Sequence, residues 1–413
     1  MDTKISILKN GAQCLLIKDS NSPSINIVAE FKAGAREEKA AINGVAHLLE
    51  HMIFKGSKSH PDPKKLVYKI ENLGANINAW TSQELTAYYI SGPKYNGLKL
   101  ISFLADMLLN PIFPEKELVK EKRVIAEEIK MYEDNPQDKV ADEFIRALFP
   151  NHSLGRNIAG SLMSLANLSV KDCQIFIKEH YSAENLLLIV AGDFDQQEVL
   201  DKLNDSFGMW PVTEVLREPD FEKIPIQDRQ VNVIKNLEQT HLVVGSYGHN
   251  YQQLGLKERW ALNLGRTILA GGFGSLLIQR FREELAMTYY IHLSNQEFRD
   301  IGYYYVALGV NPSNKNKAIT EIDKVFKKFC IGQIRESDIE RAKNYLIGNL
   351  ITYLETSSDL ATFYAKQLLF YNKISTSEEI IKIIKNINKD DILRMWKPLL
   401  QENKIVAVLG SEK

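Results

Sequence analysis

The chain has 413 residues, and its 51 lysines and arginines nearly balance its 52 aspartates and glutamates, giving a formal net charge of −1. Because there is no basic tail or stripe of Lys and Arg, nucleic acid and anionic membranes are excluded as expected partners. A composition of 45% hydrophobic and 25% charged residues is typical of a globular protein with a large core, and the length predicts two or three domains.

Targeting signals and cysteines indicate the compartment. The N-terminal segment MDTKISILKNG lacks the apolar core of a signal peptide, and no apolar run elsewhere is long enough to span a membrane. The three cysteines, Cys14, Cys173 and Cys330, are far apart and have apolar neighbours. This pattern favours buried free thiols over disulfides or a zinc knuckle. We therefore expect a cytoplasmic protein.

The first half of the chain alternates strand and helix patterns. Two strand patterns, CLLIKD at 14–19 and SINIVAEF at 24–31, precede a helix pattern that contains HLLEH at 47–51. Two further strand patterns follow, NINAW at 76–80 and LTAYYISG at 85–92. Because these two can pair antiparallel, a purely parallel sheet is disfavoured.

Helix patterns dominate the rest of this half. Glu115–Asp134 has apolar positions three and four residues apart, which predicts a long amphipathic helix. Lys171–Gly192 passes from a helix pattern through a short turn into the strand pattern LLLIVAG. Residues 213–228 are rich in proline and mixed charge, which predicts a linker.

The second half repeats these patterns in the same order. Lys389–Gly410 resembles Lys171–Gly192 at a shift of 218 residues, and Glu336–Glu355 resembles Glu115–Asp134. Since strand patterns in 232–247 also match those in 14–31, a duplicated domain is indicated. We predict an α+β fold of two homologous domains, each a mostly antiparallel sheet with helices packed on one side. The predicted domains are residues 1–212 and 229–413, joined by the linker 213–228.

The segment HLLEH carries a possible metal site. On a helix, His47 and His51 are four residues apart and project from the same face, so both imidazoles can reach one zinc ion. Glu50 adjoins His51 and can take a proton from a water on the ion without being a ligand itself. The alternative is a solvated or core histidine pair, and a third ligand is needed to decide between them.

Further motifs give the chain a family resemblance. H-x-x-E-H is the inverted zincin motif. With the surrounding motifs, the chain resembles the pitrilysin, or M16-type, family of zinc metallopeptidases, which includes insulin-degrading enzyme and the mitochondrial processing peptidase. The length fits the short two-domain bacterial type. The matching motifs are GAREE at 34–38, NGVAHLLEHMIFKGSKSHP at 43–61, ENLGANINAWTSQELTAYY at 71–89, EKRVIAEEIKMYEDNPQD at 121–138, LGRNIAGS at 154–161 and FREELAMTYYI at 281–291.

The resemblance implies a third ligand in a V-I-x-x-E pattern about 75 residues after the second histidine. Here VIAEE offers Glu127 and Glu128, and the register of the pattern favours Glu128. Glu127 is then either a residue that supports the ligands by hydrogen bonding or a solvated side chain. A shift of 221 residues places Glu128 on Asn349, so the second half has lost the ligands. The family pattern is therefore a catalytic first half and a degenerate second half.

The resemblance also implies substrate contacts in the first half. Asn78 and Ala79 match the family pair on an exposed strand edge, where an extended peptide can add by backbone hydrogen bonds. Trp80 departs from the smaller aromatic residue usual there, and an ordinary internal strand is the alternative. Glu84 occupies an acidic position of the motif, either to support the ligand histidines or for structure alone.

In the second half, the family pattern R-E-x-x-G-L-x-Y places Arg282 and Tyr289 in contact with substrate. The tyrosine hydroxyl is expected to polarise the scissile carbonyl or stabilise its oxyanion. Ala286 and Met287 replace the Gly and Leu of the pattern, which affects the expected loop conformation. Tyr290 competes for the tyrosine role, and a surface arginine beside a packed tyrosine is the alternative.

The resemblance as a whole implies a zinc-dependent endopeptidase that binds one Zn²⁺ per chain and hydrolyses peptides or small unfolded polypeptides. Larger family members join four such domains, so a two-domain chain is expected to form a homodimer, or a heterodimer with a paralogue. Arg282 and Tyr289 would then come from the partner subunit. The alternatives are a non-catalytic structural or assembly subunit and a metal-dependent hydrolase acting on other substrates.

Overall fold

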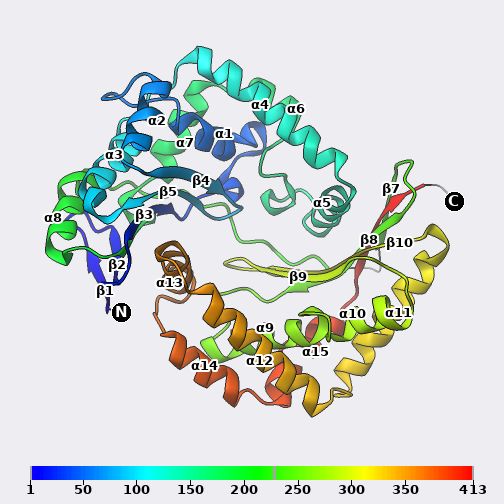
Figure 1. Ribbon diagram of the computed structural model, residues 1–413. Helices are drawn as coiled ribbons and strands as arrows, with labels where there is room; N and C mark the ends of the chain where they lie inside the picture. Colours follow the sequence, from blue (N-terminus) through cyan, green and yellow to red (C-terminus); the bar gives the residue numbers. More distant parts are fainter. Residues whose placement is uncertain (1, 227–228, 412–413) are drawn as a thin grey trace. The chain divides into compact units, whose positions relative to one another are not determined.

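The computed structural model describes residues 2–226 and 229–411. The chain divides into two compact units, each built on one β-sheet with helices (Figure 1). The first unit contains residues up to 131, 156–219 and 354–369, and the second contains 132–155, 220–353 and those from 370 onward. The predicted α+β class with two sheets is confirmed.

The sheet of the first unit has the strand order β1-β2-β6-β3-β5-β4. The pair β2–β6 is parallel and the other pairs are antiparallel, including β4 with β5 as predicted. Alternate residues of β3 bury Ile27, Ala29 and Phe31 in the core, because successive side chains of a strand point to opposite faces. The strands are β1 Asp2–Ile7, β2 Gln13–Lys18, β3 Ser24–Phe31, β4 Asn76–Thr81, β5 Thr86–Pro93 and β6 Leu186–Gly192.

Helices of the first unit cover one face of this sheet, with α1 and α2 against β4 and α3 against β5. The amphipathic pattern predicted for Glu115–Asp134 forms α4 over that same range. The helices are α1 Val45–Ile53, α2 Pro63–Asn72, α3 Gly97–Leu109, α4 Glu115–Asp134, α6 Leu162–Asn167, α7 Val170–His180 and α8 Gln196–Ser206.

The sheet of the second unit has the strand order β7-β11-β8-β10-β9, with β7–β11 parallel. This order and its one parallel pair match β2-β6-β3-β5-β4 of the first unit, which agrees with the predicted repeat. The strands are β7 Arg229–Ile234, β8 Thr240–Gly248, β9 Ile291–Glu297, β10 Gly302–Val310 and β11 Ile405–Gly410. The remaining helices are α5 Pro136–Leu148, α9 Leu256–Ala270, α10 Leu276–Ile278, α11 Lys315–Cys330, α12 Glu336–Tyr353, α13 Ser357–Tyr371, α14 Ser377–Asn386 and α15 Lys389–Gln401.

Two helices belong to the unit opposite to their place in the sequence. Helix α5 packs on the second sheet, where Val140 and Phe144 share a core with Val243 of β8. Most of α13 belongs to the first unit, where the Ser357 hydroxyl lies 3.1 Å from that of Ser24 on β3. Each sheet therefore carries a helix on the face opposite to its other helices, which the sequence patterns did not predict.

Cys14, Cys173 and Cys330 are free and buried, as predicted, and burial raises the pKa of the Cys14 thiol to about 12. Among the described residues, none of the helices combines the length and apolar character needed to cross a membrane.

Candidate metal centre

Helix α1 presents its polar residues on one side because its other side is buried. Leu48, Leu49 and Met52 are fully buried in the core of the first unit. His47 and His51, one helical turn apart, project together, and their ring centroids lie 4.9 Å apart. The helix therefore anchors itself in the core and displays two histidines at the same time.

Helix α4 brings Glu128 to these histidines. Its Oε2 lies 3.7 Å from Nε2 of His47 and 3.9 Å from Nε2 of His51. Ligand atoms of all three residues lie within 4.8 Å of one another. The 3.7 and 3.9 Å separations are too long for hydrogen bonds. Three donors around one tetrahedral zinc ion are separated by about 3.4 Å, given bonds of about 2.1 Å, so the His-His-Glu group fits such an ion.

The protonation state of His47 suits a metal ligand. Burial, helped by the nearby His51, lowers the pKa of His47 to about 4, so its ring is neutral at neutral pH. Neutral imidazole is the form that binds a metal. The Nδ1 atom of His47 is buried without a hydrogen-bond partner.

Glu121, which the sequence interpretation missed, holds the second histidine. Its Oε2 lies 3.0 Å from Nδ1 of His51, and its Oε1 lies 2.8 Å from Nζ of Lys55. Burial alone would raise the pKa of Glu121, but the contacts with His51 and Lys55 lower it overall. A carboxylate at Nδ1 keeps that nitrogen protonated and leaves Nε2 free to bind a metal. Glu121 precedes Glu128 by seven residues, two helical turns, and this spacing is the signal that could have found it.

Glu50 has a partner on the neighbouring strand. The Thr81 hydroxyl at the end of β4 donates a 2.6 Å hydrogen bond to Glu50 Oε2. Burial raises the pKa of Glu50, and the hydrogen bond from Thr81 partly opposes this shift. The sequence interpretation did not include Thr81.

Glu127 and Glu84, the two further acidic candidates, lie in different surroundings. Glu127 is 74% exposed at its side chain and pairs with Lys130 at 2.7 Å on the solvent side of α4. Glu84 accepts a 2.7 Å hydrogen bond from the buried Arg36 guanidinium.

Asn78 and Ala79 lie on β4, which is the edge strand of the first sheet. The N–H of Ala79 donates to Asn78 Oδ1 at 2.9 Å. Because an N–H in the ladder would bond to β5, this one faces the open edge. The edge position excludes the alternative of an internal strand.

Arg282 and Tyr289 belong to the second unit. Arg282 lies in a π-helical segment, Gln279–Glu284, with its guanidinium 5.1 Å from the Phe273 ring centre. Tyr289 is 89% exposed, whereas the Tyr290 hydroxyl lies 2.7 Å from Nδ1 of His241.

Ala286, which replaces the glycine of the family pattern between these two residues, has φ of 46°. This left-handed conformation favours glycine, and an alanine adopts it at a cost of about 1 kcal/mol. The loop therefore keeps a glycine-like backbone despite the substitution.

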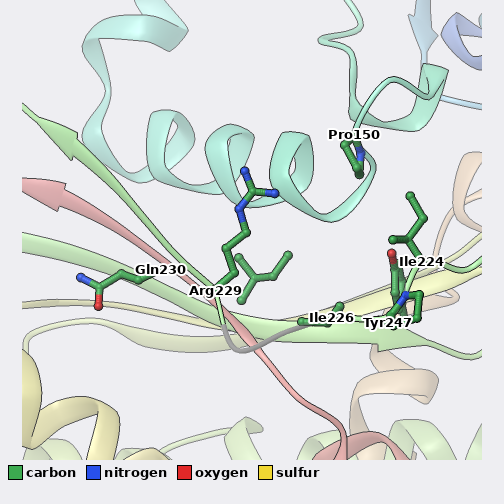
Figure 2. Close-up of a pocket in the computed structure, with 8 residues that line it drawn as sticks. Pro150, Ile224, Ile226, Arg229, Gln230 and Tyr247 are labelled. Atoms are coloured by element: carbon green, nitrogen blue, oxygen red, sulfur yellow. The ribbon is translucent and has the colours of Figure 1, made fainter.

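A separate pocket of about 440 Å³ lies in the second unit. Figure 2 shows Arg229 and Gln230 at one end and Ile224 and Tyr247 at the other. Arg229 is the one charged residue among its lining residues, which include none of the candidate metal or substrate residues.

Comparisons with known proteins match both halves. Residues 13–162 match the family model Insulinase (Peptidase family M16), and residues 167–346 match Peptidase M16 inactive domain. An uncharacterised zinc protease of Rickettsia bellii is 30% identical over 408 residues, covering 98% of this chain and 97% of the relative. The uncharacterised zinc protease YmxG of Bacillus subtilis is 28% identical over 402 residues, covering 97% of each chain.

Solved structures agree at the level of the fold. A protease from Helicobacter pylori has a TM-score of 0.89 at 22% identity and covers 99% of both chains. A protein from Pseudomonas fluorescens, described as a peptidase M16 inactive domain, has a TM-score of 0.92 at 17% identity, covering 100% of this chain and 99% of that one.

Proposed function

Because this chain belongs to the M16, or insulinase, family of peptidases, we propose that it is a zinc-dependent endopeptidase acting on peptides or small unfolded polypeptides. The observation that carries the proposal is the convergence of His47, His51 and Glu128 beside Glu50. Relatives named as zinc proteases support the choice of metal.

Each residue of the centre has a defined task in this reaction. His47, His51 and Glu128 would hold one zinc ion, which when bound supplies a Lewis acid that acidifies water and polarises the peptide carbonyl. The Glu50 carboxylate accepts the proton of the attacking water and returns it to the amine leaving group. The Thr81 hydroxyl orients the Glu50 carboxylate through its hydrogen bond to Oε2.

Substrate binds in this proposal as an added strand. The open edge of β4 offers main-chain groups, including the Ala79 N–H, to an extended peptide. The Asn78 side chain now accepts a hydrogen bond from this N–H, and a carbonyl oxygen of the peptide would replace it as acceptor. Recognition of main-chain groups suits substrates of varied sequence.

Arg282 and Tyr289 assist from the second half, with the Tyr289 hydroxyl near the scissile carbonyl. We propose a homodimer, or a heterodimer with a paralogue, in which this pair acts on the partner's site. Mixing inactive Glu50→Gln and Arg282→Ala subunits is then expected to restore cleavage. No recovery on mixing would show that each subunit is self-contained.

The central test compares zinc-loaded wild type with Glu50→Gln on a library of unstructured peptides. Wild type is expected to cleave peptides, and Glu50→Gln is expected to retain zinc and to cleave about 10³-fold more slowly. If zinc-bound Glu50→Gln cleaved peptides at the wild-type rate, Glu50 would not be the general base. A purified chain that gains no metal on dialysis against zinc would contradict the metal centre. A zinc-bound chain that cleaves nothing would indicate a non-catalytic subunit.

A further inference from the structure

The helix that carries the two histidines has no side-chain cap of its own. It begins after Gly44, which has φ of 98° and no side chain to accept a hydrogen bond. The first N–H groups of any helix lack partners within the helix and need acceptors from elsewhere. A buried helix start without such acceptors would be unstable, so another residue must supply them.

Glu38 supplies these acceptors from six residues upstream. Its Oε2 accepts hydrogen bonds from the Gly44 N–H at 2.7 Å and from Asn43 Nδ2 at 2.8 Å. Its Oε1 accepts from the Ala46 N–H at 2.8 Å. Glu38 is fully buried, at 0% exposure, and Ala46 is the residue directly before His47.

A third segment fixes the position of this cap. The Arg156 guanidinium donates to the main-chain oxygen of Glu38. A Cβ added at Gly44 would lie only 2.7 Å from the Ala159 carbonyl oxygen, so that segment packs directly on the start of α1. Two motifs without a role in the chemistry, GAREE at 34–38 and LGRNIAGS at 154–161, thus meet at the helix N-terminus.

Because the Glu38 side chain is an acid and is buried, a replacement of the same size but without the acid is expected to weaken the cap. Burial raises the pKa of Glu38 to about 7, while the hydrogen bonds from Ala46, Asn43 and Gly44 oppose the shift. A negative charge is stabilised at a helix N-terminus by the helix dipole. A glutamine would keep the size but would turn an N–H₂ group toward N–H donors.

We propose that Glu38 is a positioning residue that sets the location of His47 and Glu50 by fixing the start of α1. This inference rests on the proposed function for its effect on turnover. Its effects on metal binding and on helix order can be measured without turnover.

The test uses the full-length chain with zinc and the variants Glu38→Gln and Glu30→Gln. Glu30, on β3, is the matched control because it is 4% exposed and its pKa is also raised to about 7 by burial. Glu38→Gln is expected to lower zinc affinity about tenfold, and to lower kcat 10- to 100-fold with KM within about twofold. Hydrogen exchange of residues 44–53 is expected to accelerate at least about tenfold. Glu30→Gln is expected to leave zinc affinity and kcat unchanged and not to accelerate the exchange of residues 44–53.

The outcomes of this test separate a role of Glu38 in positioning α1 from no such role. Equal zinc affinity and equal exchange in Glu38→Gln and Glu30→Gln would overturn the inference. Should Glu38→Gln fail to fold, Asn43→Ala removes one donor to Glu38 and keeps both backbone bonds. It is then expected to change the same quantities by a smaller amount, and wild-type values would overturn the inference. A wild type that binds zinc but cleaves no peptide refutes the proposed function, while exchange and zinc affinity still decide the role of Glu38.

Discussion

Helices α1 and α9 occupy corresponding places in the two repeats but use their surfaces differently. Helix α1 is nine residues long and leaves one side for His47, Glu50 and His51. Helix α9 is fifteen residues long and packs against α12 and α15, with Gly265 in contact with the Trp396 ring. The same scaffold thus carries either a candidate metal site or additional core. The repeat therefore fixes the framework, and a few side chains decide whether it presents possible metal ligands.

The largest effect is expected from substituting Glu128, the proposed third ligand, and the comparison is a substitution at its counterpart in the second half, Asn349. Glu128→Gln removes an anionic ligand and is expected to abolish stoichiometric zinc binding and to lower peptide cleavage by more than about 10³-fold. Asn349→Ala changes the corresponding, exposed position of α12 and is expected to leave both unchanged. Metal analysis and peptide cleavage on the two purified variants make the comparison. If Glu128→Gln retained zinc at full stoichiometry, Glu128 would not be the third ligand.

The next effect distinguishes two glutamates on one helix. Glu121→Gln weakens the hold on the His51 ring and is expected to lower zinc affinity or kcat by about 10- to 100-fold. Glu127→Gln alters a side chain that faces solvent beside Lys130 and is expected to behave as wild type. Competition with a chromophoric chelator measures the affinities. Equal losses in both variants would show that charge on α4, rather than the contact with His51, matters.

A smaller effect is expected at the strand that adjoins α1. Thr81→Val keeps the shape of the side chain but removes the hydroxyl that binds Glu50, and it is expected to lower kcat about tenfold. Thr81→Ser restores a hydroxyl and is expected to recover most of this loss. Steady-state kinetics of both variants at saturating zinc measure it. A valine variant as fast as wild type would limit Thr81 to packing.

The last effect contrasts the two sheets and concerns stability, with the smallest change expected in peptide cleavage. In the first sheet Glu30 lies opposite Leu187. In the second sheet the corresponding position is Gly245, which lies opposite Ile405. Burial raises the pKa of Glu30 to about 7 from an ordinary value of 4.5, and Lys366 and Lys32 partly oppose this. The folded state therefore holds this proton more tightly than the unfolded chain, so stability falls as pH rises from 4.5 through 7.

Glu30→Gln carries no such charge and is expected to exceed wild type in stability by about 3 kcal/mol at pH 8, because each unit of pKa shift corresponds to about 1.4 kcal/mol, with little difference at pH 4. Urea unfolding of both proteins at the two pH values measures the difference. A constant difference across pH would assign the effect to packing instead of ionisation.

Local periodicity explains what the sequence could predict. The range Glu115–Asp134 of α4 follows from apolar residues three and four apart, and the antiparallel strands from alternation and turn length. The helix carrying HLLEH follows from the spacing of its leucines and methionine. In each case the signal lies within a few consecutive residues.

Contacts between distant residues explain what the sequence interpretation did not predict. The spacing of Glu121 and Glu128 could place Glu121 on the same side of α4, but its contact with His51 joins residues 70 apart, and that of Thr81 with Glu50 joins residues 31 apart. A helical pattern shows that α5 buries a face but not which sheet it covers. The exchange of α5 and α13 between the units therefore required the structure.

Helix α13 is synthesised long after the strand that it contacts. On the ribosome, β3 emerges more than 300 residues before Ser357, so at about 10 residues per second roughly half a minute separates them. During this interval the β3 face that carries Ser24 and Glu30 awaits its covering helix in the nascent chain. Polar side chains on an uncovered sheet face stay hydrated and disfavour association with other chains. Glu30, whose burial destabilises the finished protein at high pH, is therefore expected to disfavour aggregation of the incomplete chain.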